Sequence, residues 1–380
     1  MDYLLEISRI IDGAVKGDRV KVLAYTEQLI SKLRQAGDTQ AAARLRRTLD
    51  HVATSDVVMC TMSNPTHLPV DHDSRLALAD EERTTLVDEV VVLEPVIEQR
   101  VREFVLFVNA SDRLMATRVG IAPTMLIYGP PGVGKTALAR HIASKLDLPL
   151  ITSRVDSVIS SFLGSTAKNL RLLFEHARSR PCVLFLDELD AIAKLRDDEH
   201  ELGELKRVVV SLVQNIDALD NQTVLLSATN HHHLLDPAIW RRFAFRIELA
   251  LPTAEARRRM VELFLEDYYG GGDTHVLATI TEGLSGADIR LVCENAIRLA
   301  VIGNQSQVST TDLIRGFIRM RLGETFDFAS KESAGIRSAY ELAPDVLTYR
   351  HLAAVFDTSE PTISRRLNDE GRTYGKSRKK

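Results

Sequence analysis

Residues 129–136 read Gly-Pro-Pro-Gly-Val-Gly-Lys-Thr, and their types and spacing suit the binding of a polyphosphate. Glycines let backbone N–H groups approach the phosphates, and a helix N-terminus adds positive potential. Lys135 can reach the terminal phosphates, and the Thr136 hydroxyl can hold Mg²⁺. Residues 123–128 predict a buried strand and residues 137–146 predict a helix, which is the context that a phosphate-binding loop needs.

Two further apolar runs end in polar residues that suit hydrolysis. Residues 183–186 are apolar without alternation, which is typical of a central strand covered on both faces. Asp187 and Glu188 follow directly, so Asp187 can hold Mg²⁺ and Glu188 can act as general base on a water. Residues 223–230 predict a third strand, whose last residue, Asn230, either positions that water or caps the next helix.

These motifs together resemble those of AAA-type ATPases of the AAA+ superfamily, over about residues 87 to 322. The order is that of Walker A (129–136), Walker B (186–188) and the first sensor (Asn230), and residues 283–289 resemble the second sensor segment. The resemblance implies an α/β fold, with a parallel sheet sandwiched by helices in a P-loop AAA+ module and a small helical lid. It implies ATP and Mg²⁺ as cofactors, with Thr136 and Asp187 at the metal. The nucleotide contacts that it implies are Gly129, Pro130, Pro131, Gly132, Val133, Gly134, Lys135, Thr136, Ala137, Asp187, Gly286 and Ala287.

Residues 235–243 resemble the family's arginine-finger segment, with Arg241 and Arg242 adjacent as in katanin and spastin. A guanidinium stabilises charge on a transferring phosphoryl group and is worth on the order of 10³–10⁵ in rate. In the family these arginines act on the ATP of the neighbouring subunit, so the resemblance implies a homo-oligomer, usually of six subunits. It implies Glu188, Asn230, Arg241 and Arg242 as catalytic residues. Without the family, two surface arginines closing a helix would explain the same pattern.

Residues 161–164 fall where the family has its first pore loop, with Phe162 and Leu163 as the residues that grip a threaded polypeptide. Ser161 replaces the usual lysine, and a core position for Phe162 is the alternative. The intersubunit Asp-Gly-Phe element of the family is altered here to Asp-Ala-Leu, at residues 217–219.

Composition and spacing limit the other possibilities. The 380 residues contain no apolar run that could span a bilayer, and the N-terminus lacks the basic region and apolar core of a secretory signal. We therefore expect a cytoplasmic protein without a membrane partner. The three cysteines, Cys60, Cys182 and Cys293, lack metal-ligand spacing. Histidines and aspartates at 67–73 and three histidines at 231–233 could bind a metal, but their polar surroundings favour a linker and a solvated loop.

The chain divides by pattern into six segments. We expect an N-terminal helical bundle at 1–52, a linker at 53–84, the large ATPase subdomain at 85–252, the helical lid at 253–322, a connector at 323–345, and a helix-turn-helix with a basic tail at 346–380. The bundle shows three runs with helical spacing, the first on Leu4, Ile7, Ile10, Ile11 and Ala14. Such a bundle either recruits partners or only packs on the ATPase.

The tail resembles the helix-turn-helix of bacterial resolvases and regulators, whose second helix enters the major groove. Leu352, Val355, Phe356, Ile363 and Leu367 would be buried, with Ala354 at the close approach of the helices and Asp357 in the turn, where glycine is usual. The residues left to face DNA are Thr362, Ser364, Arg365 and Arg366. Seven basic and two acidic residues follow from Pro361, a surplus that suits phosphate contacts with double-stranded DNA, although a solvated basic tail has the same composition.

Two functions fit these features. In the first, an oligomeric, Mg²⁺-dependent ATPase remodels a protein or a protein–DNA complex, with a protein partner that could be a protease. In the second, a DNA-binding regulator or a defence or mobile-element factor uses ATP mainly as an assembly switch.

Overall fold

The computed structural model places most of the chain in two compact units. It describes residues 3–16, 19–46, 68–71, 75–83, 91–111, 114, 122–158, 163–193, 202–219, 223–271, 274–323, 325–330 and 332–369. The first unit comprises Met1–Val91, Pro95–Gly129 and Lys135–Leu249, and the second comprises Val92–Glu94, Pro130–Gly134 and Ala250–Lys380. None of the described helices is long and apolar enough to cross a membrane.

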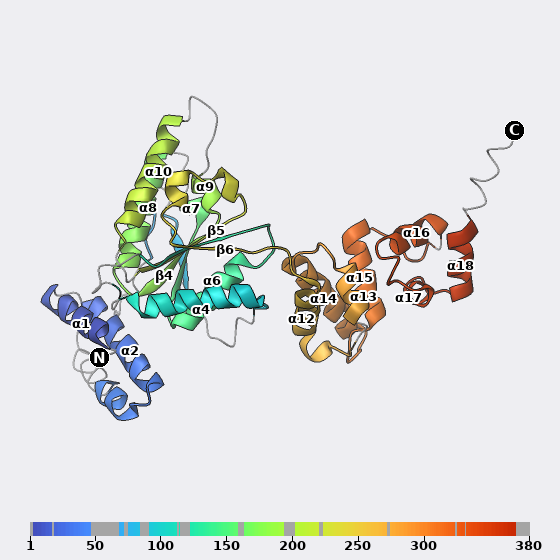
Figure 1. The fold of residues 1–380 in the computed structure, drawn as a ribbon, viewed down its shortest axis with the longest axis horizontal. Helices are drawn as coiled ribbons and strands as arrows, with labels where there is room; N and C mark the ends of the chain where they lie inside the picture. Colours follow the sequence, from blue (N-terminus) through green and yellow to red (C-terminus); the bar gives the residue numbers. More distant parts are fainter. Residues whose placement is uncertain are drawn as a thin grey trace. The chain divides into compact units, whose positions relative to one another are not determined.

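The first unit contains a six-stranded sheet in the order β1-β3-β4-β5-β2-β6 (Figure 1). Its strands are β1 (Ala79–Glu82), β2 (Thr124–Tyr128), β3 (Leu150–Ser153), β4 (Cys182–Leu186), β5 (Thr223–Thr229) and β6 (Phe245–Glu248). Strand β1 is antiparallel to β3, and all other neighbours are parallel. Every residue of β4 and β5 is buried, as a parallel sheet with two covered faces requires.

Helices cover both faces of this sheet. The helices of the first unit are α1 (Leu4–Lys16), α2 (Arg19–Gln35), α4 (Pro95–Asn109), α6 (Lys135–Leu146), α7 (Val155–Val158), α8 (Leu163–Arg178), α9 (Leu189–Ala193), α10 (Leu202–Asp217), η1 (His232–Leu234) and α11 (Pro237–Trp240). Helices α8 and α10 pack together and share an apolar core with Leu184 and Leu225 of the sheet. The following residues, Phe185 and Leu226, are also fully buried, and they point to the opposite face because side chains alternate along a strand. There α4 and α6 contact β6 and β5, which confirms the predicted α/β fold (Figure 1).

The N-terminal helices pack on each other and are tied to the rest of the first unit. Residues 39–46 are also helical, so the three predicted helical runs are present, although Leu4's side chain and residues 17–18 lie outside what is described. The Ser31 hydroxyl donates to a carboxylate oxygen of Asp147 at 2.8 Å. The predicted apolar face of the first helix is wrong in part, because Ile7 and Ile11 are 47% and 57% exposed. Glu6 is buried instead, since Lys32 of α2 pairs with its carboxylate at 2.6 Å.

The second unit is helical. Its elements are α12 (Ala254–Leu265), η2 (Glu266–Tyr268), α13 (Thr274–Ile280), α14 (Gly286–Ile302), α15 (Thr310–Leu322), α16 (Ser333–Glu341), α17 (Tyr349–Val355) and α18 (Glu360–Asp369). Helices α12 to α15 all lie within the predicted lid, residues 253–322. Local capping explains two of their starts: the Ser285 hydroxyl accepts from the Asp288 amide in a capping box, and the Ser309 hydroxyl accepts from the Asp312 amide at 3.1 Å.

The C-terminal helices are continuous with the core of the lid. A single apolar cluster runs from Val261 in α12 to Ile363 in α18. The segment predicted to be a connector contains α16, whose Ile336 and Ala339 are fully buried in that cluster. Helix α16 spans only 9 residues, so its apolar period is a weak signal in the sequence, and packing on α15, α17 and α18 decides which of its residues are buried.

Candidate functional site: a phosphate loop, paired acids and two arginines

The phosphate loop begins where β2 leaves the sheet. The Gly129 amide donates to the Thr229 carbonyl at 3.4 Å, and the Lys135 ammonium donates to the Gly129 carbonyl at 2.9 Å. Gly129 has a φ of +149°, and a Cβ there would lie 2.0 Å from the Leu249 carbonyl oxygen. Only glycine therefore allows β2 to turn into the loop beside the residues that follow β6.

The tip of the loop, Pro130–Gly134, belongs to the second unit. Its Gly132 carbonyl accepts from the Ala287 amide at 3.0 Å, at the start of α14. A Cβ on Gly132 would lie 2.5 Å from the Ser285 hydroxyl, so this glycine also permits a close approach. The structure thus brings the loop tip together with Gly286 and Ala287, which remain predicted nucleotide contacts.

The two predicted magnesium ligands lie side by side. The Thr136 hydroxyl, in the first turn of α6, donates to a carboxylate oxygen of Asp187 at 2.9 Å. A hydroxyl and a carboxylate are the hard oxygen ligands that Mg²⁺ prefers, so this pair fits the ion. Glu188 follows in a left-handed backbone conformation with a φ of +48°, its amide bonded to the other Asp187 oxygen at 2.9 Å. The Glu188 side chain is exposed, and strained residues of this kind gather at functional sites.

Lys135 is buried, with 7% of its surface exposed. Burial lowers the pKa of its ammonium group, and the charges of Asp187 and Asp190 act in the opposite direction. Asp190 also accepts the Thr229 hydroxyl at 2.7 Å, so it links β5 to the acids that follow β4. Sequence reasoning missed Asp190, because its partner is 39 residues away; the available signal was a third acid after the apolar run.

Asn230 follows the end of β5, between the phosphate loop after β2 and the paired acids after β4. Strand β5 lies between β4 and β2, and the register pairs Leu186 with Ser227 and Tyr128 with Thr229. The carboxyl ends of these three parallel strands therefore meet at one edge, where open α/β sheets bind ligands. Asn230 is half-buried there, directly after β5.

The adjacent arginines have different surroundings. Helix α11 begins because the Asp236 side chain accepts from the Ala238 amide at 2.7 Å with Pro237 in the first turn, and the arginines follow its end. The Arg242 guanidinium forms two 2.9 Å bonds to the carboxylate of Asp217, at the end of α10. These bonds lower the pKa of Asp217 and raise the pKa of Arg242. Arg241 is exposed, and none of the described side chains pairs with it.

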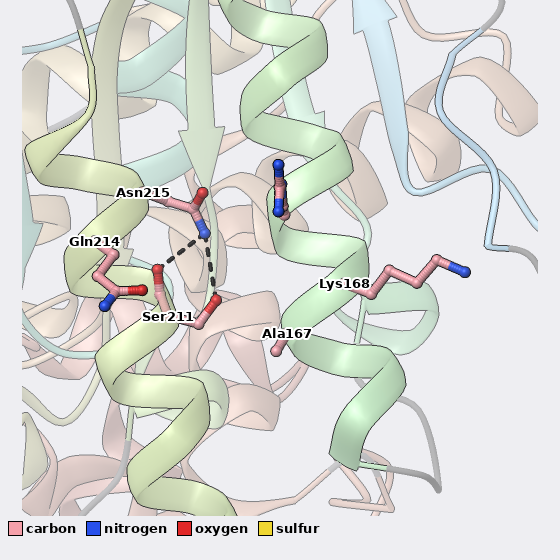
Figure 2. Close-up of a pocket in the computed structure, with 6 residues that line it drawn as sticks. Ala167, Lys168, Ser211, Gln214 and Asn215 are labelled. Atoms are coloured by element: carbon pink, nitrogen blue, oxygen red, sulfur yellow. Dashed lines mark hydrogen bonds between the residues drawn. The ribbon is translucent and has the colours of Figure 1, made fainter.

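The predicted pore residues are described only in part. Phe162 lies outside the described residues, and Leu163 is the first residue of α8 with its side chain outside them as well. A groove of about 450 Å³ lies between α8 and α10, lined by Ala167, Lys168, Arg171, Ser211, Gln214 and Asn215. In Figure 2 the Asn215 amide is bonded to Ser211 of its own helix, and Lys168 points away from α10. The groove contains no predicted site residue, so it is separate from the nucleotide chemistry.

A short turn joins α17 to α18. Asp357 has a φ of +47°, and Pro361 lies in the first turn of α18. Leu352, Val355 and Ile363 are fully buried. The predicted close approach at Ala354 is wrong, because that residue is exposed and its neighbour Ala353 is buried. One residue turns a helix by about 100°, and the face of α17 is set by its packing on α15.

Of the predicted DNA contacts, Arg365 is exposed, while Thr362, Ser364 and Arg366 are half-buried. The basic residues beyond position 369 lie outside the described part of the chain. Arg315 of α15 holds the turn: its guanidinium donates to the Val355 carbonyl at 2.9 Å and to Asp357 at 2.9 Å. The turn is therefore fixed to the lid by a charged side chain near the end of a helix, where positive charge is favourable.

The other candidate metal groups do not form a site in the described part of the chain, which contains no cluster of three or more metal-ligating side chains. His67, His72 and Asp73 lie outside that part, as does Cys60. Cys182 and Cys293 are buried, and burial raises the pKa of Cys293 to about 12, so this thiol stays protonated at neutral pH.

Comparison with known proteins agrees with this arrangement. Residues 125–251 match the model of the ATPase family associated with various cellular activities (AAA), and residues 273–314 match the AAA+ lid domain. An uncharacterised AAA family ATPase of Sinorhizobium fredii, y4kL, is 40% identical over 227 residues, which are 59% of this chain and 68% of that protein.

Other relatives are named for the proteasome. The proteasome-activating nucleotidase of Methanopyrus kandleri is 33% identical over 72% of this chain and 64% of its own length. The 26S proteasome regulatory subunit 10B homolog A of Arabidopsis thaliana is 32% identical over 57% of each chain, so this chain spans less than two thirds of both proteins. Together with the phosphate loop, the paired acids and the lid, these likenesses show that the chain belongs to the AAA family of ATPases.

Proposed function

We propose that this ATPase is Mg²⁺-dependent, assembles into an oligomer whose subunits complete one another's active sites, and remodels a protein or a protein–DNA complex. The observation that supports the metal dependence is the 2.9 Å contact between Thr136 and Asp187, which places two oxygen ligands beside the phosphate loop. The magnesium ion would neutralise charge on the phosphates when bound. Lys135 holds the phosphates, and Glu188 takes a proton from the attacking water.

The two arginines divide their roles. Arg242 is held within its own subunit by Asp217, so it orients the end of α11. Arg241 is exposed beside it and is the residue that reaches the neighbouring subunit's ATP. Sharing of this kind requires an oligomer, and the resemblance to AAA proteins supports a ring of six. Asn230, at the end of β5, positions the water.

Threading of a polypeptide through that ring is the remodelling step. It is supported by the aromatic Phe162 in the first pore-loop position and by relatives named as proteasome-activating nucleotidases. A protease that receives the threaded chain is the partner that those names suggest. The cytoplasm, where an ATP-driven machine finds its nucleotide, is the location that fits.

Phe162→Ala is expected to abolish unfolding of a substrate protein while basal ATP hydrolysis stays within about two-fold, because the side chain touches substrate and not nucleotide. Unfolding of a tagged fluorescent protein, alone and with a compartmental protease, measures this. Phe162→Tyr, which keeps an aromatic ring, serves as the matched control. Full unfolding by the alanine variant would show that Phe162 does not grip substrate.

Double-stranded DNA is the second proposed ligand. Helix α18 presents Arg365 and the half-buried Arg366 on a unit whose turn Arg315 fixes to the lid. Removing residues 324–380 would be a poor test, because Leu352, Phe356 and Ile363 complete the apolar core of the lid. Point substitutions on the surface of α18 leave that core intact.

The double variant Arg365→Glu/Arg366→Glu is expected to weaken duplex binding at least tenfold and to flatten its salt dependence, because two phosphate contacts become repulsive. Gel-shift titrations at two salt concentrations measure both effects. Arg290→Glu/Arg298→Glu, the same change of charge at two exposed sites on α14, is the control. Equal affinity of the double variant and the parent chain would remove α18 from DNA recognition.

A DNA-bound regulator or defence or mobile-element factor, in which ATP acts as an assembly switch, is the second candidate function. The packing of α16 to α18 into the core of the lid supports it, because it joins the proposed DNA-binding helices to a subdomain of the ATPase. The two functions differ in their need for turnover. A variant that binds ATP without hydrolysing it would keep DNA-dependent activity in a switch and lose it in a remodelling machine.

A further inference from the structure

The residue directly before Arg241 is Trp240, and three side chains from other elements hold its indole. The Tyr128 ring of β2 lies 5.5 Å from the indole, between centroids, and the His232 ring of η1 lies 6.1 Å from it. Arg246 of β6 places its guanidinium carbon 4.9 Å from the indole centroid, which is a favourable cation–π distance. The same guanidinium donates to the Trp240 carbonyl oxygen at 3.1 Å. Both the side chain and the backbone at the end of α11 are therefore fixed.

Two of these residues belong to the framework of the nucleotide site. Tyr128 is the last residue of β2, immediately before Gly129, and its carbonyl accepts from the Leu249 amide at 2.8 Å. His232 follows Asn230 by two residues, and its ring lies 4.7 Å from that of Tyr128. Tyr128, His232 and Trp240, which we call the aromatic stack, thus connect the start of the phosphate loop and the end of β5 with α11.

Arg241 depends on this support more than Arg242 does. Arg242 is anchored by two bonds to Asp217, whereas none of the described side chains pairs with Arg241. The direction in which Arg241 leaves the surface is therefore set by the backbone at Trp240, at the end of a helix of only four residues. A displacement of about 1 Å at a catalytic group can cost on the order of 100-fold in rate.

We propose that Trp240 is a positioning residue for Arg241, and that the aromatic stack links a subunit's own phosphate loop to the arginine it offers its neighbour. The inference rests on the proposed function, in which Arg241 acts on the adjacent subunit's ATP. It gives the ring a route for communication in a chain whose Asp-Gly-Phe element is altered. At that element Asp217 instead holds Arg242, and Leu219 is buried in the core.

Trp240→Leu is expected to lower kcat for ATP hydrolysis by on the order of 10- to 100-fold, with KM for ATP within about two-fold, because the variant's own site keeps its loop and acids. Trp240→Phe, which keeps a ring in the stack, should recover most of the activity. Mixing Trp240→Leu with Lys135→Ala subunits should restore turnover, because each Lys135→Ala subunit still presents a well-placed Arg241. The double variant Trp240→Leu/Arg241→Ala should be no slower than Arg241→Ala alone.

The mixtures separate failure of this inference from failure of the shared site. If Arg241→Ala mixed with Lys135→Ala regains no activity, the shared site is wrong. If that mixture recovers and the Trp240→Leu mixture does not, Trp240 acts on its own subunit's site and the positioning role is overturned. An increased KM with unchanged kcat would overturn it equally.

Arg246→Gln provides a second measurement that does not depend on the folding of Trp240→Leu. Arg246 is exposed, so its loss leaves the core intact, but it removes both the carbonyl bond and the cation–π contact at Trp240. We expect a smaller loss of kcat, rescued by Lys135→Ala in the same way. Arg100→Gln on α4 is the matched surface control. Parental kcat in Arg246→Gln would contradict the inference.

Discussion

Replacement of Arg241 by alanine is expected to lower kcat for ATP hydrolysis by at least about 10³-fold, because an arginine finger contributes on the order of 10³–10⁵ in rate. ATP affinity should change little, since Arg241 lies outside its own subunit's phosphate loop and paired acids. Phosphate release at saturating ATP measures the rate, and equilibrium binding of a labelled nucleotide measures the affinity. Because the Arg241 side chain is exposed, its removal should leave the fold intact, and a folding defect would not explain such a loss of activity.

Mixed oligomers decide whether the residue acts on a neighbour. Arg241→Ala and Lys135→Ala subunits are each expected to be nearly inactive alone, and their mixture should regain turnover where an intact loop faces an intact Arg241. Arg242→Ala is the comparison: its guanidinium is tied to Asp217 of the same subunit, so we expect a smaller loss. Absence of rescue at every mixing ratio would show that the site is not shared between subunits.

Glu188→Gln is expected to retain ATP binding and to lower turnover by on the order of 10²–10⁴, the usual contribution of a general base. Glutamine has the same size and fits the left-handed backbone at this position about as well, so the loop and the Thr136–Asp187 contact should stay in place. Because ATP is then held and not cleaved, the assembled oligomer should accumulate. Gel filtration with ATP and Mg²⁺ tests assembly, and the same measurement with EDTA tests the metal dependence.

The control for this variant is Glu98→Gln, on the exposed surface of α4, where the same change removes only a surface ion pair with Arg102. It should hydrolyse ATP at the parental rate. Parental turnover in Glu188→Gln would show that Glu188 is not the general base. Asp190 would then be the next carboxylate to test, because it lies beside Lys135 and Thr229.

Local chemistry explains why much of the architecture could be predicted. The phosphate loop, β2, α6 and the lid helices depend on neighbouring residues: glycines where φ is positive, a serine cap before α14 and apolar runs for buried strands. The turn at Asp357 belongs to the same class, since aspartate tolerates a left-handed backbone.

Predictions failed where burial depends on a distant partner. Apolar spacing placed Ile7 and Ile11 in a core, yet α1 turns Glu6 inward because Lys32 of α2 pairs with it. Ala354 was assigned to a helix contact, but packing of α17 on α15 buries Ala353 instead. An apolar period in the sequence indicates that one face of a helix is buried, but it does not show which other element packs against that face.

The amino-acid sequence by itself determined the family and the ATPase activity. The phosphate-binding residues are adjacent in the chain, so their types and spacing identify the site without the fold. Only the tertiary structure decided how the two arginines differ. Asp217 lies 25 residues before Arg242, and the rings that hold Trp240 come from β2 and η1. Contacts of this kind form when distant segments pack together, and the residue types along one segment do not encode them.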